Sequence, residues 1–193
     1  MHRLSSSFIL GYHGCDRSIG EQILGGAHLK PSRNKYDWLG PGIYFWEANP
    51  QRGLEFAREA SSRKASKITD PFVIGAVIDL GICLDLTTSG AIEWVKSAYN
   101  SLVTVAQTAQ MPLPQNKGDG LRRNLDCAVI MHLHRILAEK DLSSVDTVKG
   151  VFTEGPPIYP GSGFDEKKHI QIAVCNPACV KGVFRVPEHS LSR

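Results

Sequence analysis

The sequence predicts a single α+β domain with a largely antiparallel core sheet flanked by helices. Short apolar segments with strand character cluster near both ends of the chain, whereas helical periodicity is concentrated in the middle. A chain of 193 residues is also long enough to bury a substantial core and normally folds as one unit. We therefore treat residues 1–193 as one domain.

Local patterns predict the order of the elements. In chain order they are a strand at 8–14, a helix at 17–24, an ordered loop at 30–41, a strand at 43–46, a helix at 50–66, a strand at 71–80, helices at 90–110 and 125–140, a strand at 148–152, a long loop at 153–168 and strands at 169–176 and 180–186. Long ordered loops in compact domains are often functional, so both loops are candidate parts of a site.

The ends of the first two helices have clear sequence signals. Gly25 and Gly26 end the first helix, because glycine readily adopts the left-handed conformation that often follows a helix. Asn49 and Pro50 begin the second, since asparagine caps free amides and proline lacks an N–H that would be unpaired there. The apolar side of this second helix is expected at Leu54, Ala57 and Ala60.

The middle of the chain contains an apolar strand and two long helices. Residues 71–80 are almost continuously apolar, which favours a centrally buried strand. The helical periodicity of 90–110 is carried by Ile92, Val95, Tyr99, Leu102, Ala106 and Ala109. The apolar side of 125–140 consists of Val129, Leu133, Ile136 and Leu137. His132 and His134 point to different faces of that helix, so we expect a surface pair and no shared metal.

Composition and charge exclude several classes of protein. There is no apolar run long enough to cross a membrane, and the N-terminal segment lacks the features of a secretory signal, so we expect a cytoplasmic protein without a membrane partner. The five cysteines are odd in number and lack CxxC spacing, which favours neither a disulfide framework nor a metal site. The net charge of +3 permits a polyanionic partner without requiring one.

Two short motifs stand out within the first third of the chain. His13-Gly14 lies at the end of the first strand, and residues 40–45 read GPGIYF around Tyr44. Taken alone, His13 is typical of a structural histidine and Tyr44 of a core residue. In this order and spacing, however, they resemble the ADP-ribosyltransferases of the poly(ADP-ribose) polymerase and diphtheria-toxin type. These enzymes carry HG[ST] on the first strand, a helix ending in glycine, a variable loop and then G-x-G-[IV]-Y-F.

The resemblance implies a fold, a co-substrate and residue roles. The fold would be ADP-ribosyltransferase-like, with a mostly antiparallel split β core, and the co-substrate would be NAD without a metal. His13 would hold ribose hydroxyls, the Gly14 backbone would bind the nicotinamide amide, and Tyr44 would stack on the nicotinamide. Phe56 would be a second stacking aromatic or a core residue. Further contacts would come from Lys30 to the phosphates and from Ser32 or Asn34 to the adenosine side.

Two departures from the family pattern affect the expected activity. Gln171 occupies the position of the family's glutamate, and it accepts hydrogen bonds without a negative charge. Losing a charge-stabilising group costs about 2.7–4 kcal/mol in a transition state, by analogy with oxyanion holes. We therefore expect single transfer rather than polymer synthesis. Cys15 replaces the hydroxyl that follows HG. Asp165 or Glu166 would serve as general base, or both belong to a solvated charge cluster.

The acceptor of the ADP-ribose stays open between a protein and a single-stranded nucleic acid. Exposed bases need aromatic platforms, and the two loops contain or adjoin Tyr36, Trp38, Trp46, Tyr159 and Phe164. A compact transferase of this kind resembles a bacterial toxin or phage-defence effector, which would need a neutralising antitoxin or immunity protein. The alternatives are an NAD glycohydrolase and a catalytically silent module that binds NAD or ADP-ribose.

Overall fold

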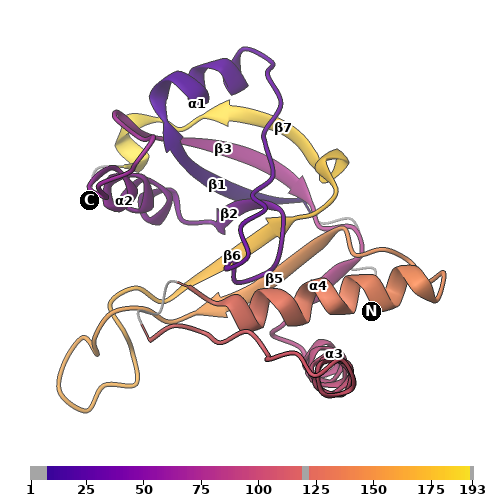
Figure 1. The fold of residues 1–193 in the computed structure, drawn as a ribbon. Coiled ribbons are helices and arrows are strands. Elements are labelled where there is room, and N and C mark those ends of the chain that lie inside the picture. The colour runs from indigo at the N-terminus through magenta and orange to yellow at the C-terminus, as the bar shows by residue number, and fades with distance from the viewer. Residues whose placement is uncertain (1–7, 119–121, 192–193) are drawn as a thin grey trace.

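Seven strands form one continuous sheet in the computed structural model, which describes residues 8–118 and 122–191 (Figure 1). The strand order is β4-β5-β6-β2-β1-β3-β7, and β4 and β5 are parallel whereas the other neighbours are antiparallel. The strands are β1 (Phe8–Asp16), β2 (Ile43–Glu47), β3 (Pro71–Asp79), β4 (Cys83–Asp85), β5 (Thr147–Phe152), β6 (His169–Val174) and β7 (Val180–Arg185). The helices are α1 (Arg17–Leu24), α2 (Pro50–Ser61), α3 (Ser89–Thr108) and α4 (Asn124–Glu139).

The predicted α+β class and mostly antiparallel sheet are confirmed, and each expected strand and helix is present. The short strand β4 was not predicted from the sequence. It has only three residues, and its parallel pairing with β5 joins segments about sixty residues apart, which no local pattern indicates.

The junction between β1 and β2 is the weakest pairing in the centre of the sheet. These strands share only two residue pairs, Gly11 with Glu47 and Tyr12 with Trp46, whereas β1 and β3 share nine. In Figure 1 the β1-β3-β7 half and the β2-β6-β5 half accordingly run in different directions across the molecule. The backbone ladder ends where the motif residues His13 and Tyr44 begin.

The glycine end of α1 and the Asn49 cap of α2 are found as the sequence predicted, whereas the side-chain cap at the start of α1 was not predicted. The Asp16 carboxylate accepts from the Ser18 amide at the start of α1, and Gly26 follows its end with a φ of 104°. The Asn49 side chain accepts from the Arg52 amide at the start of α2. Helix α2 ends at Ser61, five residues before the expected end.

Helix α2 packs very closely on β1. Gly14 of β1 faces Gly53 of α2, and a Cβ atom on Gly14 would overlap the Gly53 carbonyl oxygen. The predicted apolar side of α2, which consists of Leu54, Ala57 and Ala60, is buried there. The glycine of the HG motif is therefore required by helix–sheet packing, whatever else its backbone contacts.

Helices α3 and α4 cover the other end of the sheet, near β4, β5 and β6 (Figure 1). The α4 residues Val129, Leu133 and Leu137 are buried as predicted. The predicted apolar side of α3 is only partly right. Val95 and Leu102 pack against this core together with Ala91 and Ala98, whereas Ile92 and Tyr99 are exposed. Small alanines make the contact because they allow α3 to approach α4 closely.

The two histidines of α4 are not a surface pair, which corrects the sequence-based expectation. His132 is buried, with Nε2 3.0 Å from the Ser101 hydroxyl of α3 and Nδ1 accepting from Arg135. His134 is partly buried, and burial lowers the pKa of its imidazole. Packing against α3, which periodicity within α4 does not report, decides the environment of His132.

Membrane association and targeting can be addressed only in part. In the described ranges, no helix combines the length and apolar character needed to cross a bilayer. The prediction about an N-terminal leader falls largely on residues 1–7, which lie outside the described residues.

Replacing Gly14 with alanine should destabilise the fold. The new methyl group meets the backbone of α2, which can only respond by shifting the helix, so we expect a loss of about 1–3 kcal/mol in unfolding free energy. Urea unfolding followed by circular dichroism measures this loss. Gly182→Ala is the matched control, because a Cβ at that strand glycine has no neighbour within 4 Å. Equal midpoints for the two variants would contradict the close packing of α2 on β1.

Candidate functional site

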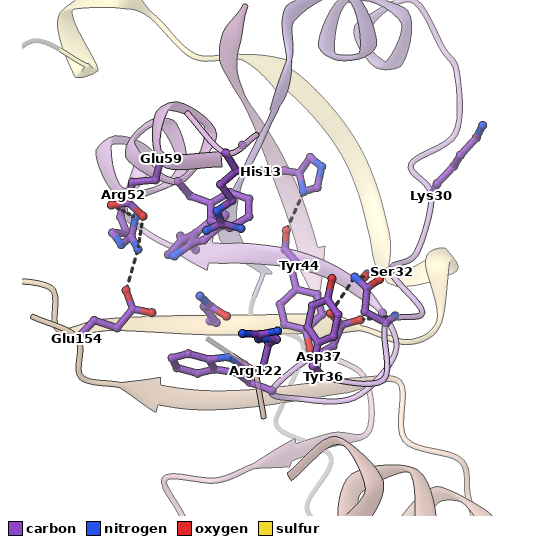
Figure 2. Close-up of a pocket in the computed structure, with 18 residues that line it drawn as sticks. His13, Lys30, Ser32, Tyr36, Asp37, Tyr44, Arg52, Glu59, Arg122 and Glu154 are labelled. Atoms are coloured by element: carbon purple, nitrogen blue, oxygen red, sulfur yellow. Dashed lines mark hydrogen bonds and ion pairs between the residues drawn. The ribbon is translucent and has the colours of Figure 1, made fainter. Parts of the chain in front are cut away.

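A pocket of about 700 Å³ opens where β1 and β2 diverge (Figure 2). Its walls come from β1, the loop at 30–42, β2, α2 and β6, with Arg122 and Glu154 contributing from two further segments. It is lined by all eight residues to which the resemblance gave a role in NAD binding or reaction: His13, Gly14, Lys30, Ser32, Asn34, Tyr44, Phe56 and Gln171. Its volume lies within the range of small-molecule sites.

His13 joins the two diverging strands through its side chain. Its Nδ1 lies 2.8 Å from the Tyr44 carbonyl oxygen, in place of the next rung of the backbone ladder. A carbonyl oxygen only accepts, so Nδ1 carries a proton and donates it. Burial lowers the pKa of His13, which keeps the ring neutral near pH 7. The remaining nitrogen, Nε2, is therefore a hydrogen-bond acceptor.

Tyr44 fixes the turn that precedes its own strand. Its hydroxyl donates to the Gly40 carbonyl at 2.8 Å and accepts from the Leu39 amide at 2.9 Å. Gly40 has a φ of 78°, a conformation that favours glycine. Burial raises the pKa of the Tyr44 hydroxyl, so the group stays protonated and keeps its donor role. The loop at 30–42 is thereby held along one side of the pocket.

The residues of that loop interact mainly with each other. Ser32 forms a two-way backbone bridge with Gly42, and the Asn34 side chain donates to the Ser32 hydroxyl at 2.8 Å and to Asp37 at 3.2 Å. Lys30 is exposed at the rim, and Figure 2 shows its side chain directed outward. The loop thus presents a preformed polar edge to the pocket.

Gln171 lies on the floor of the pocket, on the strand that the sequence predicted. It pairs with Trp46 of β2 on one side and with Gly150 of β5 on the other. Cross-strand partners point to the same face of a sheet, so Trp46 and Gln171 lie side by side, and both line the pocket. On the other side of Gln171, the space at Gly150 is filled by the side chains of Leu39 and Phe152.

A stripe along α2 forms the wall opposite the loop, and the sequence interpretation missed most of it. Arg52, Phe56 and Glu59 follow one another at steps of four and three, which places them on one helix face. The Phe56 ring packs 4.8 Å from Trp46, so it both lines the pocket and belongs to an aromatic cluster. The sequence offered one indication of this stripe: its residues lie on a different helix face from the apolar residues Leu54, Ala57 and Ala60.

A paired charge cluster closes one end of the pocket. Arg52 is buried, and its guanidinium contacts Glu154 at 2.8 Å and Glu59 at 3.4 Å (Figure 2). Lys167 contacts Glu59 at 2.8 Å. A buried cation is tolerated only when it is paired in this way, so the cluster ties α2 to the loop at 153–168.

Neither Asp165 nor Glu166 lines the pocket with Gln171, which favours the solvated charge cluster over the general base among the two interpretations of these residues. Asp165 forms a backbone bridge with Pro157, and exposed Glu166 lies in a separate shallow hollow beside Lys167. The carboxylate that this loop contributes is Glu154. It directly follows β5 and Thr153. The loop folds back on itself, so Asp165 and Glu166 lie on its returning arm, opposite residues 156 and 157.

Cys15 does not line the pocket, although the sequence placed it in the motif. Its thiol faces Gly20 of α1, and burial together with Asp16 raises its pKa to about 11. It therefore behaves as a small apolar side chain. Among residues 8–118 and 122–191, no cluster of histidine, cysteine or acidic side chains is arranged to hold a metal ion.

The lining combines aromatic faces with an excess of one positive charge. The positively charged lining residues are Lys30, Arg52, Arg63 and Arg122, and the negatively charged ones are Asp37, Glu59 and Glu154. Aromatic rings suit a flat heterocycle, and a net cationic pocket suits phosphate groups. Such an arrangement can hold a nucleotide.

Comparisons with known proteins do not identify the chain. No family model and no solved structure matches it. A segment of 36 residues is 47% identical to the uncharacterized protein MJ0359 of Methanocaldococcus jannaschii. This match covers 19% of the chain and 17% of that protein, so the chain spans less than two thirds of this relative.

Tyr44→Phe should destabilise the protein through the loop at 30–42. The substitution removes the partner of the buried Leu39 amide and of the Gly40 carbonyl, which costs about 1–3 kcal/mol. Urea unfolding gives the loss, and amide hydrogen exchange should show faster exchange at Leu39. The same change at exposed Tyr159 is the control and should have no effect. Unchanged exchange at Leu39 would contradict the bond.

The stability of the protein should fall as the pH drops below 6.5. Burial lowers the pKa of His13, His132, His134 and His169, so the unfolded chain takes up protons before the folded protein does. Each imidazole can contribute a slope of at most about 1.4 kcal/mol per pH unit below its unfolded pKa. Urea midpoints measured from pH 7.5 to 5 report the sum, and a flat profile would show that these rings titrate normally.

Proposed function

We propose that this protein is a mono-ADP-ribosyltransferase, which cleaves NAD and transfers one ADP-ribose to a macromolecular acceptor. One observation carries the proposal. Eight residues that the resemblance assigned to NAD, scattered from 13 to 171 in the sequence, line a single pocket of about 700 Å³. Core packing alone gives no reason for these particular residues to meet around an open space.

The nicotinamide half of NAD would bind between β1, β2 and α2. Tyr44 and Phe56 offer aromatic faces for the ring, and the free Nε2 of His13 can accept a hydrogen bond from a ribose hydroxyl. The Gly14 backbone lies beside them for the carboxamide. The neutral state of His13 supports this role, because a protonated ring has no acceptor and would repel a ribose that gains positive charge.

The adenosine diphosphate half would extend toward the loop at 30–42. Arg63 in the lining and exposed Lys30 at the rim would supply cationic groups for the two phosphates, with the Lys30 side chain turning inward to reach them. Ser32 and Asn34 offer polar contacts on the adenosine side. Electrostatic attraction of this kind weakens with ionic strength, so NAD affinity should decline as salt is added.

The reaction breaks the bond between the ribose C1′ and the nicotinamide nitrogen. Nicotinamide leaves as a neutral molecule, the acceptor nucleophile bonds to C1′, and the proton of the nucleophile passes to solvent. Positive charge develops on the ribose, as in glycoside hydrolysis. Gln171 offers an uncharged oxygen near this centre, which orders the ribose and provides less charge stabilisation than a carboxylate. Single transfer therefore suits this site better than chain elongation.

The decisive experiment incubates the purified protein with adenylate-labelled NAD and a cell lysate, and follows nicotinamide release together with attached label. We expect both signals, and we expect His13→Ala to reduce them about tenfold or more, as the loss of about 1.4 kcal/mol in binding predicts. His28→Ala is the matched control, because His28 is exposed and lies outside the pocket. Gln171→Ala provides a second variant if His13→Ala fails to fold.

Each outcome distinguishes a class of activity. Label removed by protease identifies a protein acceptor, and label removed by ribonuclease identifies an RNA acceptor. Free ADP-ribose without attached label would replace the transferase by an NAD glycohydrolase. Saturable NAD binding without nicotinamide release would leave a binding module. Absence of both binding and release would refute the proposal.

A further inference from the structure

The orientation of the Gln171 amide can be deduced from its neighbour His169. Both residues belong to β6 and point to the same face of the sheet, since side chains two apart on a strand share a face. Gln171 Nε2 lies 3.1 Å from His169 Nε2, and His169 Nδ1 lies 2.8 Å from the Lys167 carbonyl oxygen. These two contacts form a short chain that begins at the backbone and ends at the pocket.

The backbone contact fixes the tautomer of His169. A carbonyl oxygen has no proton to give, so Nδ1 must carry the hydrogen and donate it. His169 is buried between the rings of Trp46 and Phe152, at centroid distances of 6.5 and 6.1 Å. Burial is the main cause that lowers the pKa of His169 and keeps the imidazole neutral near pH 7. Its Nε2 is then an acceptor only.

Because His169 Nε2 is an acceptor, it can contact only the NH₂ end of the Gln171 amide. The NH₂ group of Gln171 must face the imidazole, and the carbonyl oxygen Oε1 must face away from it. We propose that His169 is a positioning residue that holds the Gln171 amide so that its oxygen is presented to the pocket as the acceptor for a ribose hydroxyl. This inference rests on the proposed NAD-dependent function.

The contact with His169 matters because the glutamine side chain, unlike that of glutamate, carries two different groups, an acceptor oxygen and a donor NH₂. A carboxylate presents an acceptor in either orientation, whereas an amide rotated by 180° presents NH₂. The positive end of the amide dipole would then lie next to a ribose that gains positive charge. His169 therefore allows an uncharged side chain to serve where the resembled family uses a charged one, and the benefit is greatest in the transition state.

Protonation of His169 should reverse the orientation. A protonated imidazole donates from both nitrogens, so Nε2–H would bind Oε1 and turn the NH₂ toward the pocket. Other groups around this ring influence when this happens. Glu154 and Glu59 and the bond to Lys167 raise the pKa of His169, whereas burial and the Arg52 guanidinium lower it. His13 is a second neutral imidazole and itself lines the pocket, so its effect must be separated experimentally from that of His169.

Nitrogen NMR of the imidazole tests the geometry without NAD. We expect protonated Nδ1, unprotonated Nε2 and a through-hydrogen-bond coupling between His169 Nε2 and Gln171 Nε2 at pH 7.5. Below the pKa of His169 the coupling should vanish, because the amide has turned. A proton on Nε2 at pH 7.5, or no coupling at any pH, would overturn the proposal.

Turnover profiles test the consequence. Wild-type kcat should fall as the pH drops below the ordinary histidine value of 6.5, toward the lowered pKa of His169. His169→Phe keeps an aromatic ring but no nitrogen, so its kcat should be about tenfold lower at pH 7.5, with KM for NAD changing less, and this limb of the profile should flatten. His132→Phe is the matched control, since His132 is also buried but lies outside the pocket, and its profile should match the wild type.

Gln171→Glu provides a second test in case His169→Phe misfolds. A carboxylate faces Nε2 favourably only when Nε2 carries a proton, so this variant should raise the pKa of His169. Because a carboxylate presents an acceptor to the ribose in either orientation, the kcat of this variant should not show the wild-type fall at low pH. An unaltered wild-type limb in His169→Phe would assign that limb to His13 and overturn the proposal. Absence of NAD binding despite the expected NMR coupling would instead refute the ribose assignment together with the proposed function.

Discussion

The hydrogen bond from His13 Nδ1 to the Tyr44 carbonyl is the interaction on which the site depends. It occurs where the β1–β2 ladder stops after two residue pairs, so an imidazole occupies a position that a backbone rung would otherwise fill. The strands stay connected while their backbones separate, and the pocket lies in the resulting gap. The same bond fixes the tautomer of His13. One hydrogen bond therefore both connects the separating strands and makes Nε2 of His13 an acceptor.

The second constraint is the close contact between α2 and β1. Because Gly14 and Gly53 meet without side chains, the helix lies directly on the strand, and its opposite face is carried to the pocket. Arg52 is thereby brought into a buried position, where Glu154 and Glu59 neutralise it. The contact between the two glycines thus positions the charged side chains of α2, which neither glycine touches. The ion pair of Arg52 with Glu154 then links α2 to the loop after β5.

Uncharged polar groups occupy the centre of the pocket, while the carboxylates at its end are paired with Arg52. His13, Tyr44 and Gln171 are all neutral in this setting, since burial lowers the histidine pKa and raises that of the tyrosine. Orientation therefore decides what each group offers to a ligand, as donor or as acceptor. In such a pocket, the hydrogen-bond partners that fix the tautomer of a histidine or the orientation of an amide decide how a ligand is bound, which a charged side chain would do through its charge.

The sequence by itself determined most of the secondary structure and the motif residues. Capping at Asn49, the glycines at 25 and 26 and the apolar strands act over a few residues, so local patterns report them. Only the tertiary structure decided which carboxylate reaches the pocket, which face of α3 is buried, and how His132 and His169 are surrounded. Those features depend on contacts between segments far apart in the chain, such as Arg52 with Glu154, and a contact of that kind leaves no periodic signal in either segment.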